Sequence, residues 1–285
     1  MHAPTNVTTE TAHLQVTGEQ LVSDLHTLGV EPGQIVLVHA SLKSLGWVVG
    51  GAPAVVRALH TAVGPDGHVV VPTGTEANSQ TSRVHRARIG TMTTEEVEAF
   101  QRDMPAFDRD NTPSGMGAIS EALRTTKGAV RSAHPQSSFA AIGPRADYLM
   151  TGHPLDCHLG PESPLGKLFA ADAQVLMIDV GFWAFTGFHL AEYTYTPDPP
   201  RQKYACVLPA ADGDRYWEYY EDVVLDDQKF EVIGEALEES LGVDSDEVMT
   251  IKRGKVGRAQ CRLVPLRPAV EFAMEWMVKH RVYPR

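Results

Sequence analysis

A histidine and a glutamate lie three residues apart just after a strongly apolar segment. His189 and Glu192 follow Val175-Leu-Met-Ile-Asp-Val180 and the connecting stretch Gly181–Gly187. If Thr186 is the N-cap of a helix, both side chains project from one face of the helix and can meet. The helix N-terminus disfavours an imidazolium and the carboxylate favours it, so the pair can hold a neutral histidine in one tautomer. This pattern predicts a general base, with an ordinary surface His/Glu pair as the alternative.

Three polar loops have the composition of ligand-binding loops. They are His39–Gly46, Thr73–Thr75 and Pro113–Gly117. Backbone amides in loops rich in serine and glycine bind phosphate or carbonyl oxygens, and Lys43 adds a positive charge. Their spacing matches neither a Walker A loop nor a dinucleotide fingerprint, so ordinary connecting loops are the alternative. If the three loops meet at one edge of a sheet, they predict a rim that binds a ligand.

Acidic and aromatic residues alternate around residue 220. Glu218, Glu221 and Asp222 follow Tyr216-Trp217 and alternate with Tyr219-Tyr220. Carboxylates beside aromatic faces can bind a polyamine or an amino sugar. A solvated hairpin face has the same pattern and is an equal alternative.

His153, Asp156, Cys157 and His158 form a second cluster of reactive residue types, all of which can bind zinc. Because no second half of a site is near in the sequence, we predict a proline-rich loop without a metal, and a zinc hydrolase is a minor alternative. Cys157 beside two histidines is also the only candidate for acyl transfer through a thiol. The cysteines number three and are widely spaced, which indicates a reducing compartment rather than a disulfide framework.

These candidates lie beside segments with clear secondary-structure patterns. Continuous apolar runs at 35–38, 68–71 and 175–180 predict strands buried on both faces. About a dozen helical residues between the first two runs predict a parallel or mixed sheet. The predicted helices run from the Thr17 cap to Gly29, over Ala52–Val63, from Pro113-Ser114 to Gly128, from the Ser163-Pro164 cap, and over Glu231–Leu241 and Ala269–His280.

The chain of 285 residues can hold one large domain or two modest ones. We expect a flexible lead-in at residues 1–16 and a single domain over 17–285, without internal repeats. Residues 76–111 interrupt the alternation of strands and helices, which predicts an inserted lid or pocket wall. A hairpin is predicted from Lys203–Leu208 and Arg215–Tyr220 around Asp212-Gly213.

The overall composition excludes several classes of protein. Hydrophobic residues make up 43% and charged residues 21%, which excludes a wholly disordered or fibrous chain. The apolar runs are far shorter than the roughly 18 residues of a membrane span, and no signal-like segment opens the chain, so we expect a cytoplasmic protein without a membrane partner. The net charge of −11 argues against nucleic acid and suits a cationic ligand or simply solubility.

Taken together, the motifs resemble those of the aminoglycoside 3-N-acetyltransferase family. The resemblance runs from Thr17 to Val264 and is specific because of the order and spacing of several modest motifs. The motifs are Val36-Leu-Val-His-Ala-Ser-Leu-Lys-Ser-Leu-Gly46, Pro72-Thr73, Thr112-Pro-Ser-Gly-Met-Gly117, the block His134–Gly143, Ser163-Pro-Leu-Gly-Lys-Leu168 and Thr186-Gly-Phe-His-Leu-Ala-Glu192.

The resemblance implies an α/β fold. The expected architecture is a three-layer α/β/α sandwich around a mixed, partly parallel sheet, with an added C-terminal antiparallel hairpin and helices. The implied activity is acetyl-CoA-dependent N-acetylation of the 3-amino group of aminoglycoside antibiotics, which confers resistance. The partners would be acetyl-CoA and a cationic aminoglycoside, with the chain as a monomer or a homodimer.

The resemblance also implies roles for particular residues. The catalytic histidine of the family matches His189, with Glu192 as its acid. The residues implied to bind the coenzyme are Ser41, Leu42, Lys43, Thr73, Pro113, Ser114, Gly115, Met116 and His134. Those implied to bind the aminoglycoside are Glu221, Asp222 and Glu76. The bulky Phe182-Trp-Ala-Phe185 segment departs from the smaller or more polar residues of many members, which leaves the preferred drug open.

The protonation state of the acceptor amine then suggests a mechanism. An amine with a reference pKa of about 10.4 is mostly protonated near neutral pH and is no nucleophile until it loses a proton. We expect His189 to take that proton directly or through one water, while Glu192 stabilises the imidazolium. Backbone amides of either 41–46 or 113–117 can serve the oxyanion. The alternatives are acetylation of a nucleotide or a non-drug amino sugar, and a binding module without turnover.

Overall fold

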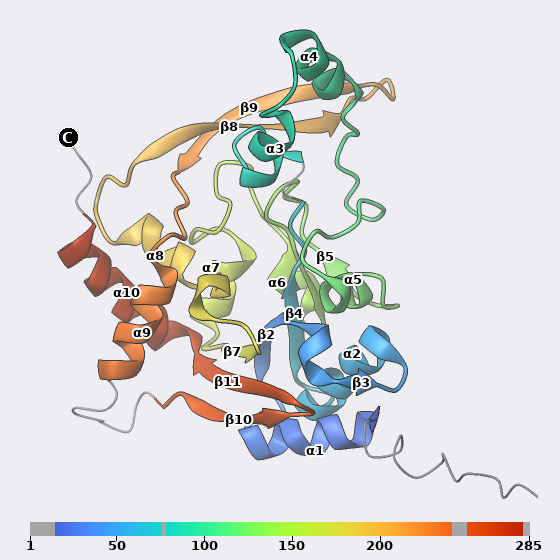
Figure 1. The fold of residues 1–285 in the computed structure, drawn as a ribbon, viewed down its shortest axis with the longest axis vertical. Helices are drawn as coiled ribbons and strands as arrows, with labels where there is room; N and C mark the ends of the chain where they lie inside the picture. Colours follow the sequence, from blue (N-terminus) through green and yellow to red (C-terminus); the bar gives the residue numbers. More distant parts are fainter. Residues whose placement is uncertain (1–14, 76–77, 241–249, 282–285) are drawn as a thin grey trace, which may run out of the picture.

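A seven-stranded mixed sheet organises the fold (Figure 1). The computed structural model describes residues 15–75, 78–240 and 250–281. Three strands of the sheet run parallel, in the spatial order β7 (Gln174–Ile178), β2 (Ile35–Ala40) and β4 (His68–Pro72). They are the three strands expected from continuous apolar runs, because a strand covered on both faces buries every side chain.

Antiparallel strands extend the sheet on both sides. β6 (Phe139–Ile142) pairs with β4, and β5 (Val130–Arg131) pairs with β6. On the other side, β11 (Ala259–Pro265) pairs with β7, and β10 (Lys252–Val256) pairs with β11. No strand was predicted over 252–265, because polar and charged residues, such as Lys252 and Arg253 of the edge strand β10 and Arg262 of β11, leave no continuous apolar run there.

Helices cover both faces of the sheet and make the predicted three-layer α/β/α sandwich. Val36 and Val38 belong to one hydrophobic core, and Leu37 to the other, as expected when successive strand residues point to opposite faces. The first core also holds residues of α1 (Gly18–Leu28), α2 (Gly51–Val63) and α5 (Ala118–Arg124). The second holds residues of α6 (Ala146–Met150), α7 (Pro164–Ala170), α8 (Phe188–Thr194), α9 (Phe230–Ser240) and α10 (Leu266–His280).

Several predicted helix ends are confirmed, and both ends of one predicted helix are wrong. The Thr17 hydroxyl accepts a hydrogen bond from the Gln20 amide, and Gly29 ends α1 with φ 104°. Ser163 caps α7 as expected. The helix predicted from Pro113-Ser114 to Gly128 instead starts at Ala118 and ends at Arg124. The preceding loop is irregular, and one of its backbone amides bonds to a neighbouring loop, as described below.

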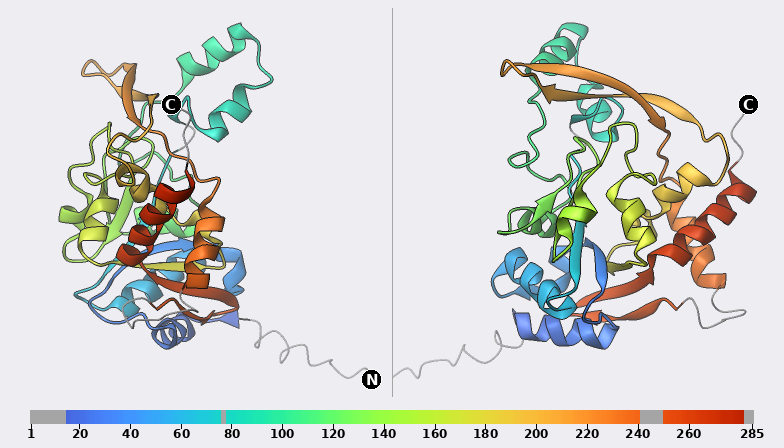
Figure 2. Two further views of the ribbon diagram at one scale, coloured as in Figure 1. Left: turned by 90° about the vertical axis from the view of Figure 1, so that its left-hand side faces the viewer. Right: turned by 180° about the vertical axis from the view of Figure 1, so that it is seen from behind.

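A long two-stranded hairpin lies apart from the central sheet. β8 (Arg201–Pro209) pairs with β9 (Arg215–Val223) around the predicted Asp212-Gly213 turn, where Gly213 has φ 89°. Two helices of the 76–111 insertion, α3 (Arg83–Ile89) and α4 (Thr94–Asp103), lie at the same end of the molecule as the hairpin (Figure 2). The amide of Phe107 donates to the carbonyl of Val207 at 3.0 Å, which joins the insertion to the hairpin.

Residues 1–14 lie outside the described residues. Gln15 and Val16, which were expected in the lead-in, form β1 (Gln15–Val16), a short strand that pairs in parallel with β3 (Trp47–Val48).

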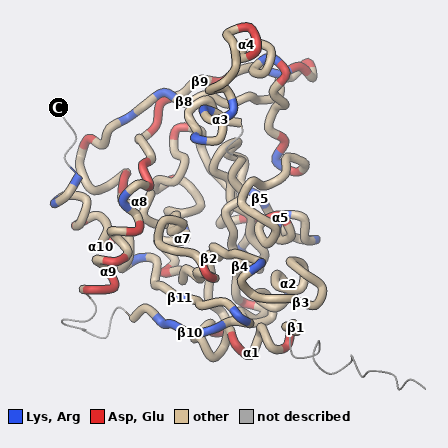
Figure 3. The backbone as a smooth tube through the Cα atoms, viewed as in Figure 1, with Lys and Arg blue, Asp and Glu red and all other residues tan. Residues whose placement is uncertain are grey.

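Near the other end of the chain, basic β10 and acidic α9 carry opposite charges (Figure 3). Arg253 and Arg262 both pair with Glu238 there. Within the described ranges, no helix is long and apolar enough to cross a bilayer.

Candidate active site

His189 and Glu192 form a hydrogen-bonded pair on α8. His189 Nδ1 lies 2.6 Å from Glu192 Oε2, and the glutamate side chain is 1% exposed against 16% for the histidine. The pairing expected from the spacing is therefore present. Thr186 does not cap the helix with its side chain, because α8 begins at Phe188 with Gly187 in the N-cap position. The pair forms regardless, since any helix places residues i and i+3 on one face.

Further donors hold the carboxylate of Glu192 in place. Its Oε1 accepts from the amide of Asp226 at 2.9 Å and from Arg281 Nη1 at 2.5 Å, while Oε2 faces the imidazole. In the neutral ring of His189, a carboxylate at Nδ1 requires the proton on that nitrogen. The lone pair then lies on Nε2, where a general base needs it. Sequence analysis missed Arg281 because it is 89 residues away from its partner.

His189 lies where two cavities adjoin. The larger has a volume of about 550 Å³ and the smaller of about 280 Å³. Six residues line both cavities, so a group bound in one can reach a group bound in the other beside His189. The shared residues are Pro72, Arg83, Met116, Thr186, His189 and Asp227.

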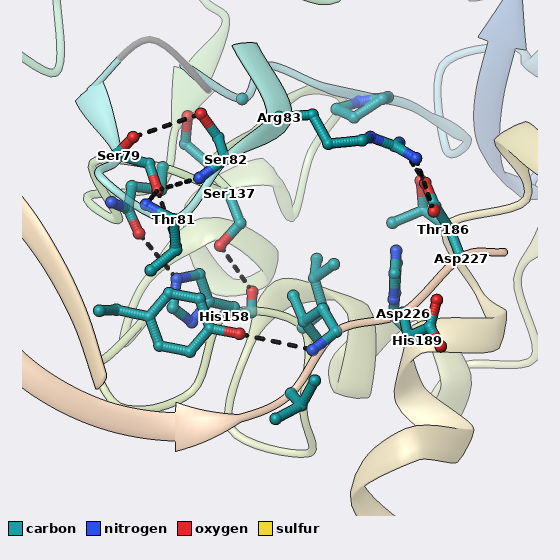
Figure 4. Close-up of a pocket in the computed structure, with 18 of the residues that line it drawn as sticks. Ser79, Thr81, Ser82, Arg83, Ser137, His158, Thr186, His189, Asp226 and Asp227 are labelled. Carbon is teal, nitrogen blue, oxygen red and sulfur yellow. Dashed lines mark hydrogen bonds and ion pairs between the residues drawn. The ribbon is translucent and has the colours of Figure 1, made fainter. Parts of the chain in front are cut away.

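The larger cavity lies between the insertion, the hairpin and the loop after β9. Hydroxyl and amide groups form part of its wall, among them those of Ser79, Ser137 and Gln202. Its acidic residues are Asp226 and Asp227, which sequence analysis did not single out although they are adjacent in the chain. Arg83 Nη1 and Nη2 pair with the two carboxylate oxygens of Asp227 at 3.0 and 2.6 Å. The two side chains reach toward one another at the edge of the cavity in Figure 4.

The smaller cavity lies at the carboxyl ends of β2 and β7. His39, Ala40 and Val180 line it at these strand ends, which is where α/β sheets bind ligands. Burial lowers the pKa of His39 to about 4. Trp183, in the one-turn helix η4 (Phe182–Ala184), also lines this cavity and is 62% exposed.

The loops expected to bind the coenzyme partly converge here. Met116 lines both cavities, and the amide of Gly115 donates to the carbonyl of Gly74 at 2.9 Å, so two of the three loops lie side by side. Thr73 is fully buried and its hydroxyl bonds to Ser138 Oγ, while its neighbours in the chain line the larger cavity. Of the nine residues expected to bind the coenzyme, Met116 alone lines these two cavities; the others are Ser41, Leu42, Lys43, Thr73, Pro113, Ser114, Gly115 and His134.

His134, also expected to bind the coenzyme, is fully buried. Its Nδ1 accepts from the amide of Gln136 at 3.1 Å, and its Nε2 lies 3.2 Å from the carbonyl of Leu155. Burial is the main cause of a pKa well below its usual range. Because both ring nitrogens are engaged within the protein, the position of His134 does not support contact with a coenzyme.

The acids expected to bind the aminoglycoside are placed differently from the expectation. Asp222 is fully buried and accepts from His158 Nδ1 at 2.7 Å and Tyr193 Oη at 2.5 Å. It therefore orients His158, which lines the larger cavity, rather than facing that cavity itself. Glu221 is exposed and lines neither cavity. Glu76 lies outside the described residues.

The cluster around Cys157 gives no support to a thiol or zinc mechanism. Cys157 is buried, and burial raises the pKa of its thiol. The ring nitrogens of His153 lie 3.0 Å from Ser132 Oγ and 2.8 Å from the carbonyl of His158, so both are engaged. Over the described ranges, no group of three or more His, Cys, Asp or Glu side chains could hold a metal ion.

Comparison with known proteins agrees with this geometry. The family model described as aminoglycoside 3-N-acetyltransferase matches residues 37–278. The SPbeta prophage-derived aminoglycoside N(3')-acetyltransferase-like protein YokD of Bacillus subtilis strain 168 is 35% identical over 93% of each chain. Aminoglycoside N(3)-acetyltransferase VII of Streptomyces paromomycinus is 32% identical over 92% of this chain and 91% of its own.

Solved structures show the same fold. The crystal structure of YokD has a TM-score of 0.82 and covers 93% of this chain and 99% of its own. AAC-VIa bound to sisomicin has a TM-score of 0.76 at 30% identity, covering 94% and 100%. AAC-IIIb with CoASH has a TM-score of 0.78 at 26% identity, covering 95% and 99%. With a family match over most of its length and relatives above 30% identity, the chain belongs to the aminoglycoside 3-N-acetyltransferase family.

Proposed function

We propose that the protein transfers the acetyl group of acetyl-CoA to the 3-amino group of an aminoglycoside and thereby confers resistance. The observation that carries the proposal is the position of His189 at the junction of two cavities. A reaction between two ligands needs both to reach one base. The CoASH complex and the sisomicin complex of relatives supply the two ligand classes.

The chemistry of the walls assigns one ligand to each cavity. The smaller cavity, at the strand ends, offers apolar surface at Val180, Trp183 and Phe230 beside polar groups, and suits the thioester end of the coenzyme. The larger cavity offers hydroxyl, amide and carboxylate groups, including Asp226 and Asp227, and suits a cationic amino sugar. Its volume of about 550 Å³ lies within the usual range for small-molecule sites.

The catalytic step is a direct transfer. The acceptor ammonium loses two protons in all: one goes to solvent, and His189 Nε2 takes the other, directly or through one water, as the nitrogen attacks the thioester carbon. Glu192 stabilises the imidazolium that results. The C–S bond then breaks, the N-acetyl bond is complete, and the imidazolium returns its proton to the coenzyme thiolate. The protein supplies orientation and one base, and no covalent acyl-enzyme is needed.

The three free cysteines agree with a cytoplasmic location for this reaction, because free thiols persist in a reducing compartment.

The deciding experiment measures free thiol from acetyl-CoA with a panel of aminoglycosides, sisomicin among them. We expect thiol release that depends on the acceptor, and a monoacetylated product with the acetyl group on the 3-amino nitrogen by NMR. Release only with a nucleotide or a non-drug amino sugar would move the function to that acceptor. Binding of both ligands without release would leave a module that binds but does not catalyse.

A further inference from the structure

His39 is a buried histidine in the wall of the smaller cavity. It lies near the carboxyl end of β2, opposite Met177 of β7, and is 6% exposed. Val38 belongs to the core beneath α1 and α2, so the next residue points to the opposite face of the sheet. That face carries α8 and α9, and His39 and His189 line the same cavity.

The Nε2 atom of His39 has no hydrogen-bond partner among the residues that the structure describes. Nearly all buried polar atoms in folded proteins are paired, because leaving one unpaired costs free energy. The residue His39 lines a ligand cavity, so we infer that the partner of this buried nitrogen is supplied by a ligand bound there. Here the ligand is the acyl end of the coenzyme, so this inference rests on the proposed function.

The ring of His39 is a neutral donor near neutral pH. Burial lowers its pKa to about 4, which leaves one ring N–H and no net charge. A neutral imidazole can donate a hydrogen bond to a carbonyl oxygen without transferring its proton. Donors of this kind, held in place before the reaction, stabilise charge that develops on oxygen in acyl transfer.

Several of the backbone amides expected to serve the oxyanion are occupied. In the first loop, the amide of Ser41 donates to the carbonyl of Ile178 at 3.0 Å. In the other loop, the amide of Gly115 donates to Gly74, and that of Met116 donates to Ser114 Oγ at 3.0 Å. His39 therefore offers a donor beside His189 where these amides are already engaged.

We propose that His39 donates a hydrogen bond from Nε2 to the carbonyl oxygen of the acyl thioester. When the acceptor nitrogen attacks the carbonyl carbon, the C=O electron pair moves onto the oxygen, and the hydrogen bond strengthens. When the C–S bond breaks, the pair returns and the thiolate leaves. The proton of His39 stays on its nitrogen throughout, so His39 is a catalytic residue distinct from the base His189.

Three substitutions of His39 separate the donor from simple packing. His39→Phe keeps a planar ring without a donor, and His39→Gln places an amide nitrogen at the same number of bonds from Cβ as Nε2. His39→Asn carries the same amide one bond shorter. We expect His39→Phe to lower kcat by about 10²–10³, the usual loss for one oxyanion donor. The kcat of His39→Gln should be at least about tenfold higher than that of His39→Phe, whereas the kcat of His39→Asn should stay much closer to it. The circular dichroism of all three variants should be unchanged.

A binding measurement tests the same contact without turnover. S-Acetonyl-CoA keeps a carbonyl near the acyl position but cannot transfer it, whereas CoASH lacks the carbonyl. By calorimetry, His39→Phe should weaken the analogue about tenfold or more and leave the Kd of CoASH within about threefold, as expected for a lost hydrogen bond. The matched control is His85→Phe, which changes a buried histidine with two unpartnered ring nitrogens that lines neither cavity. It should change neither Kd.

Two results would overturn the role of His39. One is a kcat of His39→Phe within about threefold of wild type, since a lost oxyanion donor costs far more. The other is equal weakening of CoASH and the analogue, which indicates a packing role. If the wild-type protein binds both coenzyme forms but acetylates no aminoglycoside, the proposed function fails. The two Kd values of His39→Phe then still show whether His39 contacts the acyl carbonyl oxygen.

Discussion

Arg281 and Glu192 form a buried ion pair that joins the end of α10 to the candidate active site. Nη1 and Oε1 are 2.5 Å apart, and the side chains are 6% and 1% exposed. Since Glu192 also bonds His189, the orientation of His189, the proposed base, depends on an arginine far away in the chain. Under the proposed function, the packing of α10 therefore helps to orient that base.

Substitution of Arg281 should therefore affect stability as well as turnover. Arg281→Ala leaves a buried carboxylate with one fewer donor, and breaking a buried pair in this way typically costs about 3–5 kcal/mol. We expect a loss of that size in the free energy of unfolding, measured with urea. The control is Lys279→Ala, which removes an exposed pair with Glu275 at 4.0 Å and should cost at most about 1 kcal/mol. Equal effects of the two substitutions would contradict a buried structural pair.

Substitution of His189 should lower turnover without loss of ligand binding. A general base typically contributes about 10²–10⁴ in rate, so His189→Ala should lower kcat by that factor. The Kd of CoASH should change little, because the histidine acts on the acceptor nitrogen. A variant that retains more than about a tenth of wild-type kcat would remove His189 from the role of base.

The acids of the larger cavity should control binding of the cationic acceptor. Asp227→Asn removes a carboxylate that faces both cavities, and a hydrogen bond to a charged group is worth about 1.5–3 kcal/mol. We expect the KM for an aminoglycoside to rise about tenfold or more with a smaller change in kcat. Glu221→Gln is the matched control, because Glu221 is exposed and outside both cavities. A larger effect at Glu221 would restore the expectation from sequence and contradict the assignment to Asp227.

Buried neutral histidines should make the fold sensitive to acid. Burial lowers the pKa of His153 to about 4, below its value of 6.5 in the unfolded chain. Between these values the unfolded chain binds more protons, so the free energy of unfolding falls as the pH drops from 6.5 toward 4. The loss amounts to roughly 3 kcal/mol for His153. Urea unfolding across this range should show a shallower decline in His153→Gln, and an unchanged decline would argue against a neutral His153.

Local patterns in the sequence were enough to identify the elements that carry the site. Continuous apolar runs predicted β2, β4 and β7, because strands inside a covered sheet must be apolar on both faces. The spacing of His189 and Glu192 predicted their contact, because residues three apart share a helix face whatever residue caps the helix. These features depend on neighbouring residues only.

The tertiary structure decided which polar groups face the cavities. On β9 the adjacent acids Glu221 and Asp222 differ in burial and in hydrogen bonding, because successive strand residues point to opposite faces. Tyr193 and His158 lie on the face of Asp222 and bond to its carboxylate. The partnership of Arg281 with Glu192 joins residues 89 positions apart, and the place of His39 in a cavity wall depends on helices from later in the chain. Contacts of this kind arise from long-range packing, which residue spacing alone does not encode.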